Sequence, residues 1–294
     1  MTNTSSNLTS VVMVSYHTGP VLFDSIASVL GQTEPVQLCL VDNGNPPDVV
    51  ERLRAMAAGD ARLRFISGHG NVGFSKGCNR GAEAAEGSYL LFLNPDSKLP
   101  PDALVKLKHH LARLTPPAMI GARLLGEDGK DQRGCRRALL TPKTALIEAL
   151  HLGRLFPRER LNFNEEPVPE SLTPMPAISG AFMFLAASDF RRIGGFDEGY
   201  FLHVEDLDIC LRFRRAGGAI YFAPDVVVTH IGGTSNATKV FIEKHKARGF
   251  VRYFHKNFGR DYPVFVLWLL DAAVWGRTYL KIFLAKFRNS STHT

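Results

Sequence analysis

The segment Tyr89–Asp96, with the sequence YLLFLNPD, decides the fold class. Its first five residues are apolar or aromatic, which is typical of a strand buried on both faces. Pro95 has no N–H to donate to a strand ladder, so we expect the strand to end before it. Asp96 then stands just beyond the carboxyl end of a central strand. Open parallel sheets bind ligands at this position, so Asp96 is a candidate ligand-binding residue.

The 294-residue chain has the composition of an ordinary globular protein and a formal net charge of +7. This charge favours an anionic partner such as a nucleotide or a membrane surface. No nucleic-acid module and no P-loop pattern GxxxxGK[ST] are recognisable, so we expect no nucleic-acid partner. Residues 1–10 are polar and do not read as a signal peptide. The four cysteines form no CxxC pair, which fits the reducing cytoplasm rather than a zinc site.

Strands and helices alternate along the first hundred residues. The predicted strands are Thr9–Tyr16, Pro35–Val41, Leu63–Ser67 and Tyr89–Leu93, and the predicted helices are Val21–Leu30, Asp48–Ala58 and the second half of Gly68–Gly81. This alternation predicts an α/β fold with a mostly parallel central sheet flanked by helices.

The pattern is looser after Asp96. We expect helices at Pro101–Leu114 and Glu205–Ala216, and strands at Met119–Leu125, Ile178–Leu185, Ala219–Phe222 and Val226–His230. Residues 126–176 show weak periodicity and support no detailed prediction. We place a domain boundary at 235, so that residues 1–235 form the main domain and 236–294 form a helical, basic and amphipathic extension.

The extension contains a candidate membrane-binding segment. Within 264–288, aromatic side chains recur near one helical face, and basic residues supply the charge; these are Trp268, Trp275, Tyr279, Phe283, Arg277, Lys281, Lys286 and Arg288. A helix of this kind can lie in the interface of an anionic bilayer. The alternative is a helix that packs on the protein's own core. No stretch reaches the roughly 20 apolar residues that a membrane span needs.

Acidic residues at three places could carry chemistry. Asp42 and Asp96 each follow a predicted strand, and a carboxylate there can bind a nucleotide or a hard cation. Glu205 and Asp206 begin a predicted helix, where an ionised carboxylate can take a proton from an attacking hydroxyl. The alternatives are turn formation at strand ends and capping of the first helical turn.

The run Gly68–Gly73 has the pattern GxGxxG after a strand, and Asp96 follows it at 23 residues. This is the spacing of a dinucleotide-binding fingerprint. However, the run follows the third predicted strand instead of the first, and the acid sits behind Pro95. An NAD-dependent oxidoreductase therefore stays an alternative.

With these residues in place, the sequence resembles the family 2 inverting glycosyltransferases of the GT-A fold, in their rhamnosyltransferase-like branch. The resemblance covers roughly 11–233. It is carried by VVMVSYHTG, LVDNG, NVGFSKGCNRG, LLFLNPDS, ISGAFMFL, GGFDEGYFLHVEDLDICLRFRRAGG and VTHIGG, in this order.

The resemblance implies roles for individual residues. The residues expected to line the nucleotide-sugar site are Ser15, Tyr16, Asp42, Asn43, Asn71, Gly73, Phe74, Asn79, Asn94 and Asp96. Asp206, in the pair with Glu205, matches the catalytic base, and Gly180 matches a position where a side chain would obstruct the acceptor. Asp96 and His230 match metal ligands. Asn94 replaces the first acid of the family's DxD motif.

The resemblance therefore implies a metal-dependent, inverting hexosyltransferase that uses Mg²⁺ or Mn²⁺. The implied donor is a nucleotide sugar linked to dTDP, such as dTDP-rhamnose, or to UDP. The implied acceptor is a hydroxyl of a cell-surface glycan or a lipid-linked acceptor. We expect a cytoplasmic protein, peripheral on the inner face of the membrane. A catalytically inactive sugar-nucleotide-binding module is a further alternative.

Overall fold

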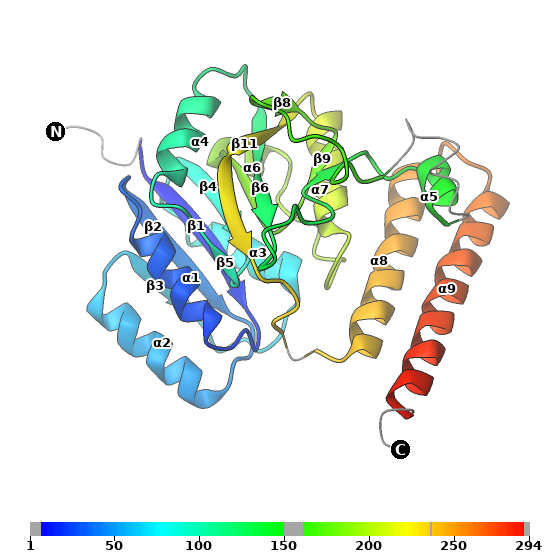
Figure 1. The fold of residues 1–294 in the computed structure, drawn as a ribbon, viewed down its shortest axis with the longest axis horizontal. Helices are drawn as coiled ribbons and strands as arrows, with labels where there is room; N and C mark the ends of the chain where they lie inside the picture. The colour runs from blue at the N-terminus through cyan, green and yellow to red at the C-terminus, as the bar shows by residue number, and fades with distance from the viewer. Residues whose placement is uncertain (1–6, 150–160, 236, 291–294) are drawn as a thin grey trace.

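The computed structural model describes residues 7–149, 161–235 and 237–290. A central mixed sheet contains nine strands in the order β3-β2-β1-β4-β10-β6-β11-β5, with β8 paired to β11 (Figure 1). They are β1 (Thr9–Ser15), β2 (Val36–Asp42), β3 (Leu63–Ile66), β4 (Tyr89–Leu93), β5 (Ser97–Lys98), β6 (Ala118–Leu125), β8 (Thr173–Pro174), β10 (Phe182–Ala186) and β11 (Ala219–His230). Two short strands, β7 (Arg136–Arg137) and β9 (Ala177–Ile178), pair separately.

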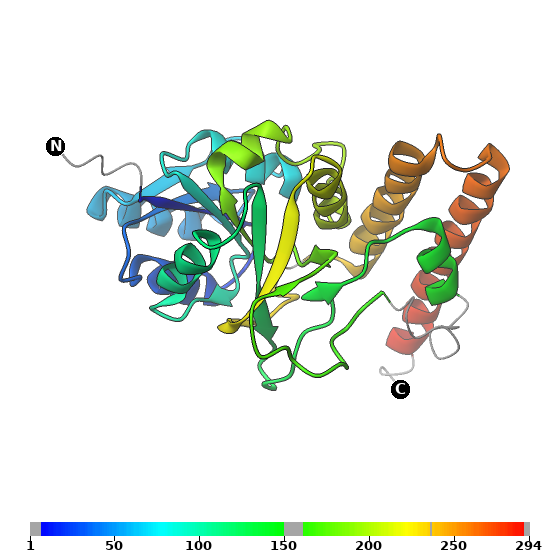
Figure 2. The same cartoon turned by 90° about the horizontal axis from the view of Figure 1, so that it is seen from above.

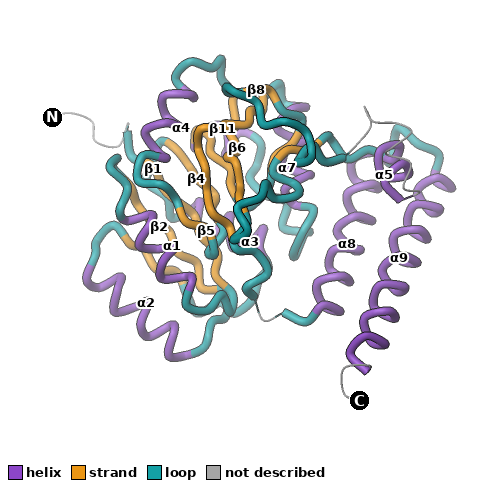
Figure 3. Tube along the Cα trace, viewed as in Figure 1, coloured by secondary structure: helices purple, strands orange, loops and turns teal. Residues whose placement is uncertain are grey.

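Helices cover both faces of the sheet, as Figure 2 shows from above. They are α1 (Val21–Leu30), α2 (Pro47–Gly59), α3 (Phe74–Glu83), α4 (Ala103–Leu111), α6 (Ala187–Arg192) and α7 (Glu205–Arg215). Helices α8 (Lys239–Phe258) and α9 (Val264–Ser290) lie side by side, and α7 lies between them and the sheet (Figure 3). Helix α5 (Pro142–Ala149) lies away from the sheet, beside α9 (Figures 1 and 2). The predicted α/β fold with a central sheet flanked by helices is confirmed.

The first four strands in the chain pair in parallel, as the alternation predicts. β1 pairs with β2 and β4, and β2 pairs with β3. Ser15 lies opposite Asp42 at the end of this register. The carboxyl ends of these strands therefore meet along one edge, and the polar residues that follow them lie along that edge.

The second half of the sheet departs from a parallel arrangement. β10 runs antiparallel to both β4 and β6. The predicted strand Ile178–Leu185 is divided into β9 and β10, because a turn occupies Ser179–Ala181. Conversely, the two predicted strands around Pro224 form the single strand β11, whose register shifts between Ala223 and Val227. A bulge of this kind tolerates Pro in a strand.

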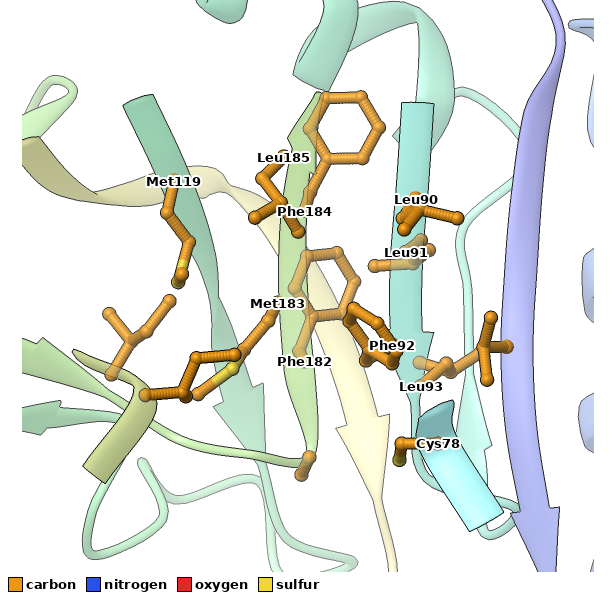
Figure 4. Packing of buried hydrophobic residues seen from close by; sticks show 14 of the residues in the cluster. Cys78, Leu90, Leu91, Phe92, Leu93, Met119, Phe182, Met183, Phe184 and Leu185 are labelled. Atoms are coloured by element: carbon orange, nitrogen blue, oxygen red, sulfur yellow. The ribbon is translucent and has the colours of Figure 1, made fainter. Parts of the chain in front are cut away.

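The apolar run of β4 lies at the centre of the hydrophobic core. Leu91 and Phe92 are fully buried, one on each face of the sheet, and β4 pairs with β10, where Phe184 lies opposite Leu91 (Figure 4). The Phe92 ring packs against Phe196 at 5.0 Å between centroids. Aromatic and aliphatic side chains from both strands thus fix the position of the segment 94–96 that follows β4.

The C-terminal helices share this core. Tyr253, Phe254 and Phe258 of α8 and Leu267 of α9 are buried and belong to the main hydrophobic cluster. The Thr238 hydroxyl caps α8 by accepting a 3.2 Å hydrogen bond from the Phe241 N–H. Residues from both sides of position 235 therefore belong to one hydrophobic core, and the predicted domain boundary at 235 stays a prediction.

A polar network also joins α7 to α8. The Asp208 carboxylate is fully buried and accepts hydrogen bonds from Lys256 at 2.9 Å, Asn257 at 3.1 Å and Tyr200 at 3.1 Å. Arg212 forms a 2.7 Å ion pair with the same carboxylate. A buried charge with this many partners is stabilising in place and costly to leave unpaired.

Candidate active site

The residues after β1, β2 and β3 come together at the carboxyl edge of the sheet. Asn43 donates from Nδ2 to Asn71 Oδ1 at 3.2 Å and to the Gly73 carbonyl at 3.1 Å. Its Oδ1 accepts from the Val72 N–H at 3.2 Å. One amide side chain therefore holds the loop 71–73 against the end of β2. The sequence-predicted group Asn43, Asn71 and Gly73 is brought together in space.

Asp42 and Ser15 lie next to this group. Asp42 Oδ1 accepts hydrogen bonds from the Gly44 N–H at 3.1 Å and from the Asn45 N–H at 2.8 Å, which closes the turn after β2. The Ser15 hydroxyl donates to Asn45 Oδ1 at 3.2 Å. Tyr16 is half-buried beside them. Asp42 thus stabilises the turn after β2, while its contact with a nucleotide base stays a prediction.

Gly73 permits a close approach between the glycine-rich loop and the segment before α7. Its φ of 86° lies in the region that favours glycine, and a Cβ there would come within 2.7 Å of the Phe201 carbonyl oxygen. The next residue, Phe74, donates its N–H to that carbonyl at 2.7 Å. The side chain of Asn79 pairs with both the N–H and the carbonyl of Phe196, each at 2.9 Å. Asn79 therefore ties α3 to the loop 195–198, and its role in nucleotide binding stays a prediction.

Asp96 lies where the sequence predicts, beyond β4, and His230 ends β11 beside it. Asp96 is 4% exposed, and its Oδ2 accepts from the Gly232 N–H at 3.1 Å and the Thr234 hydroxyl at 3.0 Å. Its Oδ1 lies 3.2 Å from His230 Nε2 in a geometry that is not that of a hydrogen bond. Burial raises the pKa of Asp96, but His230 and the Thr234 hydroxyl together lower the pKa by more than burial raises it, so the net shift is downward.

Gln132 orients the His230 ring. Its Nε2 donates to the His230 carbonyl at 2.5 Å, so its Oε1, which is 2.5 Å from His230 Nδ1, must act as an acceptor. The proton of a neutral imidazole is then on Nδ1, and the lone pair of Nε2 faces Asp96. Asn94 Nδ2 lies 3.1 Å from the same Nε2. The Asn94 amide therefore donates to this unprotonated Nε2, and Asp96 Oδ1 is the atom that lacks a donor among the described residues. A metal cation would satisfy Asp96 Oδ1 and could take the Nε2 lone pair in place of the Asn94 N–H.

These residues fit a divalent cation. Asp96 Oδ1 is a buried polar atom without a hydrogen-bond partner among the described residues. Mg²⁺ and Mn²⁺ prefer oxygen ligands, and Mg²⁺ is commonly held by one or two carboxylates together with substrate phosphates. No group of three or more His, Cys, Asp and Glu side chains that could hold a metal occurs in the described chain. Water molecules or the phosphates of a bound substrate would complete the coordination.

Asp206 lies at the start of α7 and is held by three donors. Its Oδ2 forms an ion pair with Arg137 and accepts from the Gly180 N–H at 3.2 Å. Its Oδ1 accepts from the Leu207 N–H at 2.8 Å. The Asp206 and Arg137 side chains are 17% and 14% exposed. Burial raises the pKa of Asp206, but the Arg137 charge and the hydrogen bonds lower it, so this carboxylate is held ionised.

Glu205 has the opposite electrostatic character. It is 7% exposed, and its Oε2 is buried without a hydrogen-bond partner in the described structure. Burial, together with the charge of Asp206, raises the pKa of Glu205 to about 8. The environment thus pushes the pKa values of two adjacent carboxyls apart, a pattern that is typical of acid–base sites.

Backbone hydrogen bonds link the neighbourhood of Asp206 to the Asn94–Asp96 segment. Gly180 donates its N–H to Asp206, and the carbonyl of the next residue, Ala181, accepts a 3.0 Å bond from the Asn94 N–H. Asp206 and the Asn94–Asp96 segment are therefore attached to two consecutive residues of one turn. A Cβ at Gly180 would lie 2.9 Å from Asp206 Cβ, so glycine is required for this approach.

The turn before α7 is strained and lies under α8. His203 and Val204 have φ values of 67° and 75°, which are unusual for non-glycine residues and most unusual for a β-branched one. Gly249 of α8 permits the contact, since a Cβ there would lie 3.0 Å from the His203 carbonyl and 3.1 Å from Val204 Cγ2. α8 thus supports the backbone that places Glu205 and Asp206.

Sequence reasoning missed Arg137 and Gln132, which contact Asp206 and His230. Both lie in 126–176, where no helical or strand periodicity predicts which side chains point inward. Strand geometry separates the neighbouring arginines: Arg136 donates to the carbonyls of Glu166 and Pro167 at 2.8 and 2.9 Å, whereas Arg137 reaches Asp206. An arginine pair in an otherwise polar stretch was the only available signal.

The sequence and the fold are similar to those of known glycosyltransferases. N-acetylglucosaminyl-diphospho-decaprenol L-rhamnosyltransferase of Mycobacterium tuberculosis is 27% identical over an alignment of 240 residues, and the match covers 75% of this chain and 75% of that one. Rhamnosyltransferase WbbL of Escherichia coli is 28% identical over an alignment of 187 residues, and the match covers 60% of this chain and 67% of WbbL.

Two solved structures share the fold. GalNAc-T7, solved with UDP, GalNAc and Mn²⁺, has a TM-score of 0.61 at 16% identity; the match covers 90% of this chain and 52% of that one. The mannosyltransferase PcManGT of Pyrobaculum calidifontis, solved with GDP-Man and Mn²⁺, has a TM-score of 0.57 at 14% identity, covering 91% and 69%.

The model of the family "Glycosyl transferase family 2" matches residues 10–181, which is more than half of the chain. The chain belongs to glycosyl transferase family 2, and it resembles the rhamnosyltransferases of that family.

Proposed function

We propose that the protein is a metal-dependent, inverting glycosyltransferase that moves a sugar from a nucleoside diphosphate to a hydroxyl of a glycan or lipid-linked acceptor. The favoured donor is dTDP-rhamnose, because the relatives from M. tuberculosis and E. coli are named rhamnosyltransferases. A UDP-sugar is the second candidate. The observation that carries the proposal is the turn at Gly180–Ala181, which holds an ionised carboxylate beside the Asn94–Asp96 segment.

In this proposal the nucleotide lies along the carboxyl edge of the sheet. Asp42 and Asn43 contact the base, Ser15 and Tyr16 lie beside the nucleoside, and the loop 71–74 closes over it. The Asn43 amide keeps this loop in place before any ligand binds. A preorganised pocket of this kind lowers the cost of ordering side chains on binding.

Asp96 and His230 would hold Mg²⁺ or Mn²⁺ against the diphosphate. The use of Mn²⁺ is supported by the GalNAc-T7 and PcManGT structures, which were solved with that ion. Bound there, the cation would stabilise the charge that develops on the leaving diphosphate. Gln132 keeps Nε2 of His230 directed at Asp96, which is the role that an outer-shell partner has for a metal-binding histidine.

Asp206 is the proposed general base. Its carboxylate takes the proton from the acceptor hydroxyl while the hydroxyl oxygen bonds to the anomeric carbon and the bond from that carbon to the diphosphate oxygen breaks. Arg137 and the Gly180 N–H keep the carboxylate ionised and oriented. Attack from the face opposite the leaving group inverts the anomeric configuration.

The exposed face of α9 supports a peripheral membrane location on the inner face of the bilayer. Large apolar side chains along α9 are more than half exposed: Val264, Phe265, Trp268, Leu269, Tyr279, Leu280, Phe283 and Leu284. A contiguous apolar face of this kind marks an interaction surface. No described helix is both long and apolar enough to cross a membrane. The side chains of Lys286 and Arg288, part of the predicted basic set, lie outside the described residues.

The test compares Asp206→Asn with the wild-type protein. A thermal-shift panel of nucleotide sugars, with and without Mn²⁺, first identifies the donor. We expect Asp206→Asn to retain donor binding and to lose transfer by a factor of at least about 10², in the range of general acid–base effects. Near-native transfer by this variant would refute the assignment. Stabilisation by NADH but not by dTDP or UDP would instead favour the oxidoreductase alternative.

A further inference from the structure

Lys246 of α8 lies near the proposed base and is a cation without a partner among the described residues. It is half-buried, and its ammonium makes no hydrogen bond or ion pair with any residue in the described ranges. Burying an unpaired charge is costly. The other lysines near the base region are neutralised, since Lys256 binds Asp208 and Lys281 binds Glu243. A half-buried ammonium that pairs with none of the described residues is a candidate binding group for an anionic ligand.

The helix contacts place Lys246 against the strained turn. His245 stacks on the Phe201 ring at 4.4 Å between centroids, and Gly249 touches His203 and Val204. Lys246 lies between these two contacts and shares the face of Gly249, because residues three apart on a helix are neighbours. This face of α8 packs against the segment 201–204, which immediately precedes Glu205 and Asp206.

The pairing of α8 with α9 adds two more cations. The ion pairs Glu243–Lys281, at 3.2 Å, and His255–Asp271, at 2.8 Å, fix an antiparallel register. In this register residue 246 lies opposite about residue 279, so that Arg277 and Lys281 flank Lys246. Burial lowers the pKa of Lys246; Lys281 and Arg277 act in the same direction, while Glu243 and Asp206 oppose them. We call Lys246, Arg277 and Lys281 the hairpin cation cluster.

Asp206 does not neutralise Lys246, because the Asp206 carboxylate is already engaged by Arg137 and two backbone N–H groups. Glu243 is the acid that pairs within the cluster, and it binds Lys281. Three cations and one carboxylate leave a local positive charge of about two. Such a charge attracts a phosphate or diphosphate group.

We propose that the hairpin cation cluster binds the diphosphate of a lipid-linked acceptor, with its lipid chain along the exposed apolar face of α9. This inference rests on the proposed function. In an inverting displacement the acceptor approaches from the side of the base, whereas the donor diphosphate lies at Asp96 and His230. The cluster is on the base side, and the apolar residues Tyr279, Leu280 and Phe283 continue from it along α9.

The experiment measures binding of geranyl diphosphate by calorimetry, with the donor site filled by whichever of dTDP and UDP stabilises the protein, plus Mn²⁺. Lys246→Met removes the charge and keeps most of the chain length. Lys244→Met, at an exposed position of the same helix, is the matched control. We expect Lys246→Met to weaken geranyl diphosphate binding by about tenfold or more, as for a lost charge-assisted hydrogen bond. Lys244→Met should bind like wild type, and Lys246→Arg should retain most of the affinity.

Two further arms separate the sources of the anionic group. Geraniol should bind wild type and Lys246→Met equally, because it lacks the diphosphate. Co-sedimentation with phosphatidylglycerol vesicles should be the same for both proteins. The proposal is overturned if Lys246→Met binds geranyl diphosphate as wild type does, or if only vesicle binding falls, which would assign the cluster to the bilayer.

The outcome is distinguishable from failure of the proposed function. If no nucleotide sugar binds and no transfer occurs, while Lys246 still determines geranyl diphosphate affinity, the glycosyltransferase reaction is wrong and the anion site stands. If transfer occurs but Lys246→Met has unchanged affinity and unchanged KM for a diphosphate-linked acceptor, the reaction stands and the anion site is wrong.

Discussion

Gly180 leaves no room for a side chain beside Asp206. An alanine Cβ would lie 2.9 Å from Asp206 Cβ and 3.6 Å from its Oδ2. Carbon atoms pack best at about 3.5–4.0 Å, so Gly180→Ala requires a shift of about 0.6 Å or more. Asp206 is tied to Arg137 and the Leu207 N–H, so the shift moves the carboxylate out of a preset position.

The expected loss follows from this displacement. Since a misplacement of about 1 Å costs about 10²-fold in rate, a shift near 0.6 Å should lower kcat by about tenfold, with KM for the donor unchanged. Overpacking should also lower the free energy of unfolding by about 1–3 kcal/mol. Steady-state transfer kinetics and urea unfolding measure both effects.

Gly276→Ala is the matched control. No heavy atom lies within 4 Å of a Cβ at Gly276, which is inside α9. This variant should keep wild-type kcat and gain about 0.5–1 kcal/mol, as alanine does in a helix. A Gly180→Ala protein with the kcat and stability of wild type would refute the steric reasoning.

Three further predictions test other parts of the site. Asp96→Ala should abolish the Mn²⁺-dependent part of donor binding in calorimetry, whereas Thr234→Ala, which keeps the carboxylate, should retain it; equal Mn²⁺ dependence in Asp96→Ala and wild type would contradict the metal assignment. Glu205, with a pKa of about 8 in the folded state, binds a proton that the unfolded chain has released, so stability should fall as pH rises from about 4.5 to about 8, by up to about 1.4 kcal/mol per pH unit. Urea unfolding midpoints measured across this pH range should fall with rising pH in wild type and in the exposed Glu83→Gln variant, and should lose this fall in Glu205→Gln. An unchanged pH dependence in Glu205→Gln would exclude Glu205 as its cause. Trp268→Glu combined with Leu269→Glu, at positions 62% and 67% exposed, should reduce co-sedimentation with phosphatidylglycerol vesicles while leaving thermal unfolding unchanged, and full vesicle binding would argue that α9 does not contact the bilayer.

The parts of the fold with strong periodicity could be predicted from the sequence. The helix Val21–Leu30 and the strand Tyr89–Leu93 have the predicted ends, because apolar spacing and Pro or Gly punctuation agree there. Local pattern could not reveal that β10 runs antiparallel to β4, since pairing direction depends on the path of the intervening 88 residues. Nor could it locate the break after Ile178, where the close approach of Asp206 sets the backbone.

For the site, the acids at strand ends and at the start of α7 were predictable, because their positions follow from topology. Their partners were not. Arg137 and Gln132 reach the site from a region with little regular structure, and Thr234 reaches Asp96 from the loop after β11. Lys246 reads in the sequence as one of many basic residues. It is distinguished by having no partner in the described part of the chain, which only the packing of α8 reveals.

The buried network around Asp208 has a consequence for chimeric enzymes. Lys256 and Asn257 of α8 share one carboxylate with Tyr200 and Arg212, on the segment that leads into and includes α7. A chimera that joins residues 1–235 to the C-terminal helices of another enzyme would remove Lys256 and Asn257. The buried Asp208 carboxylate would then lose two of its partners. A donor hairpin should therefore be transplanted together with the stretch that follows α6, so that both sides of the network come from the same parent.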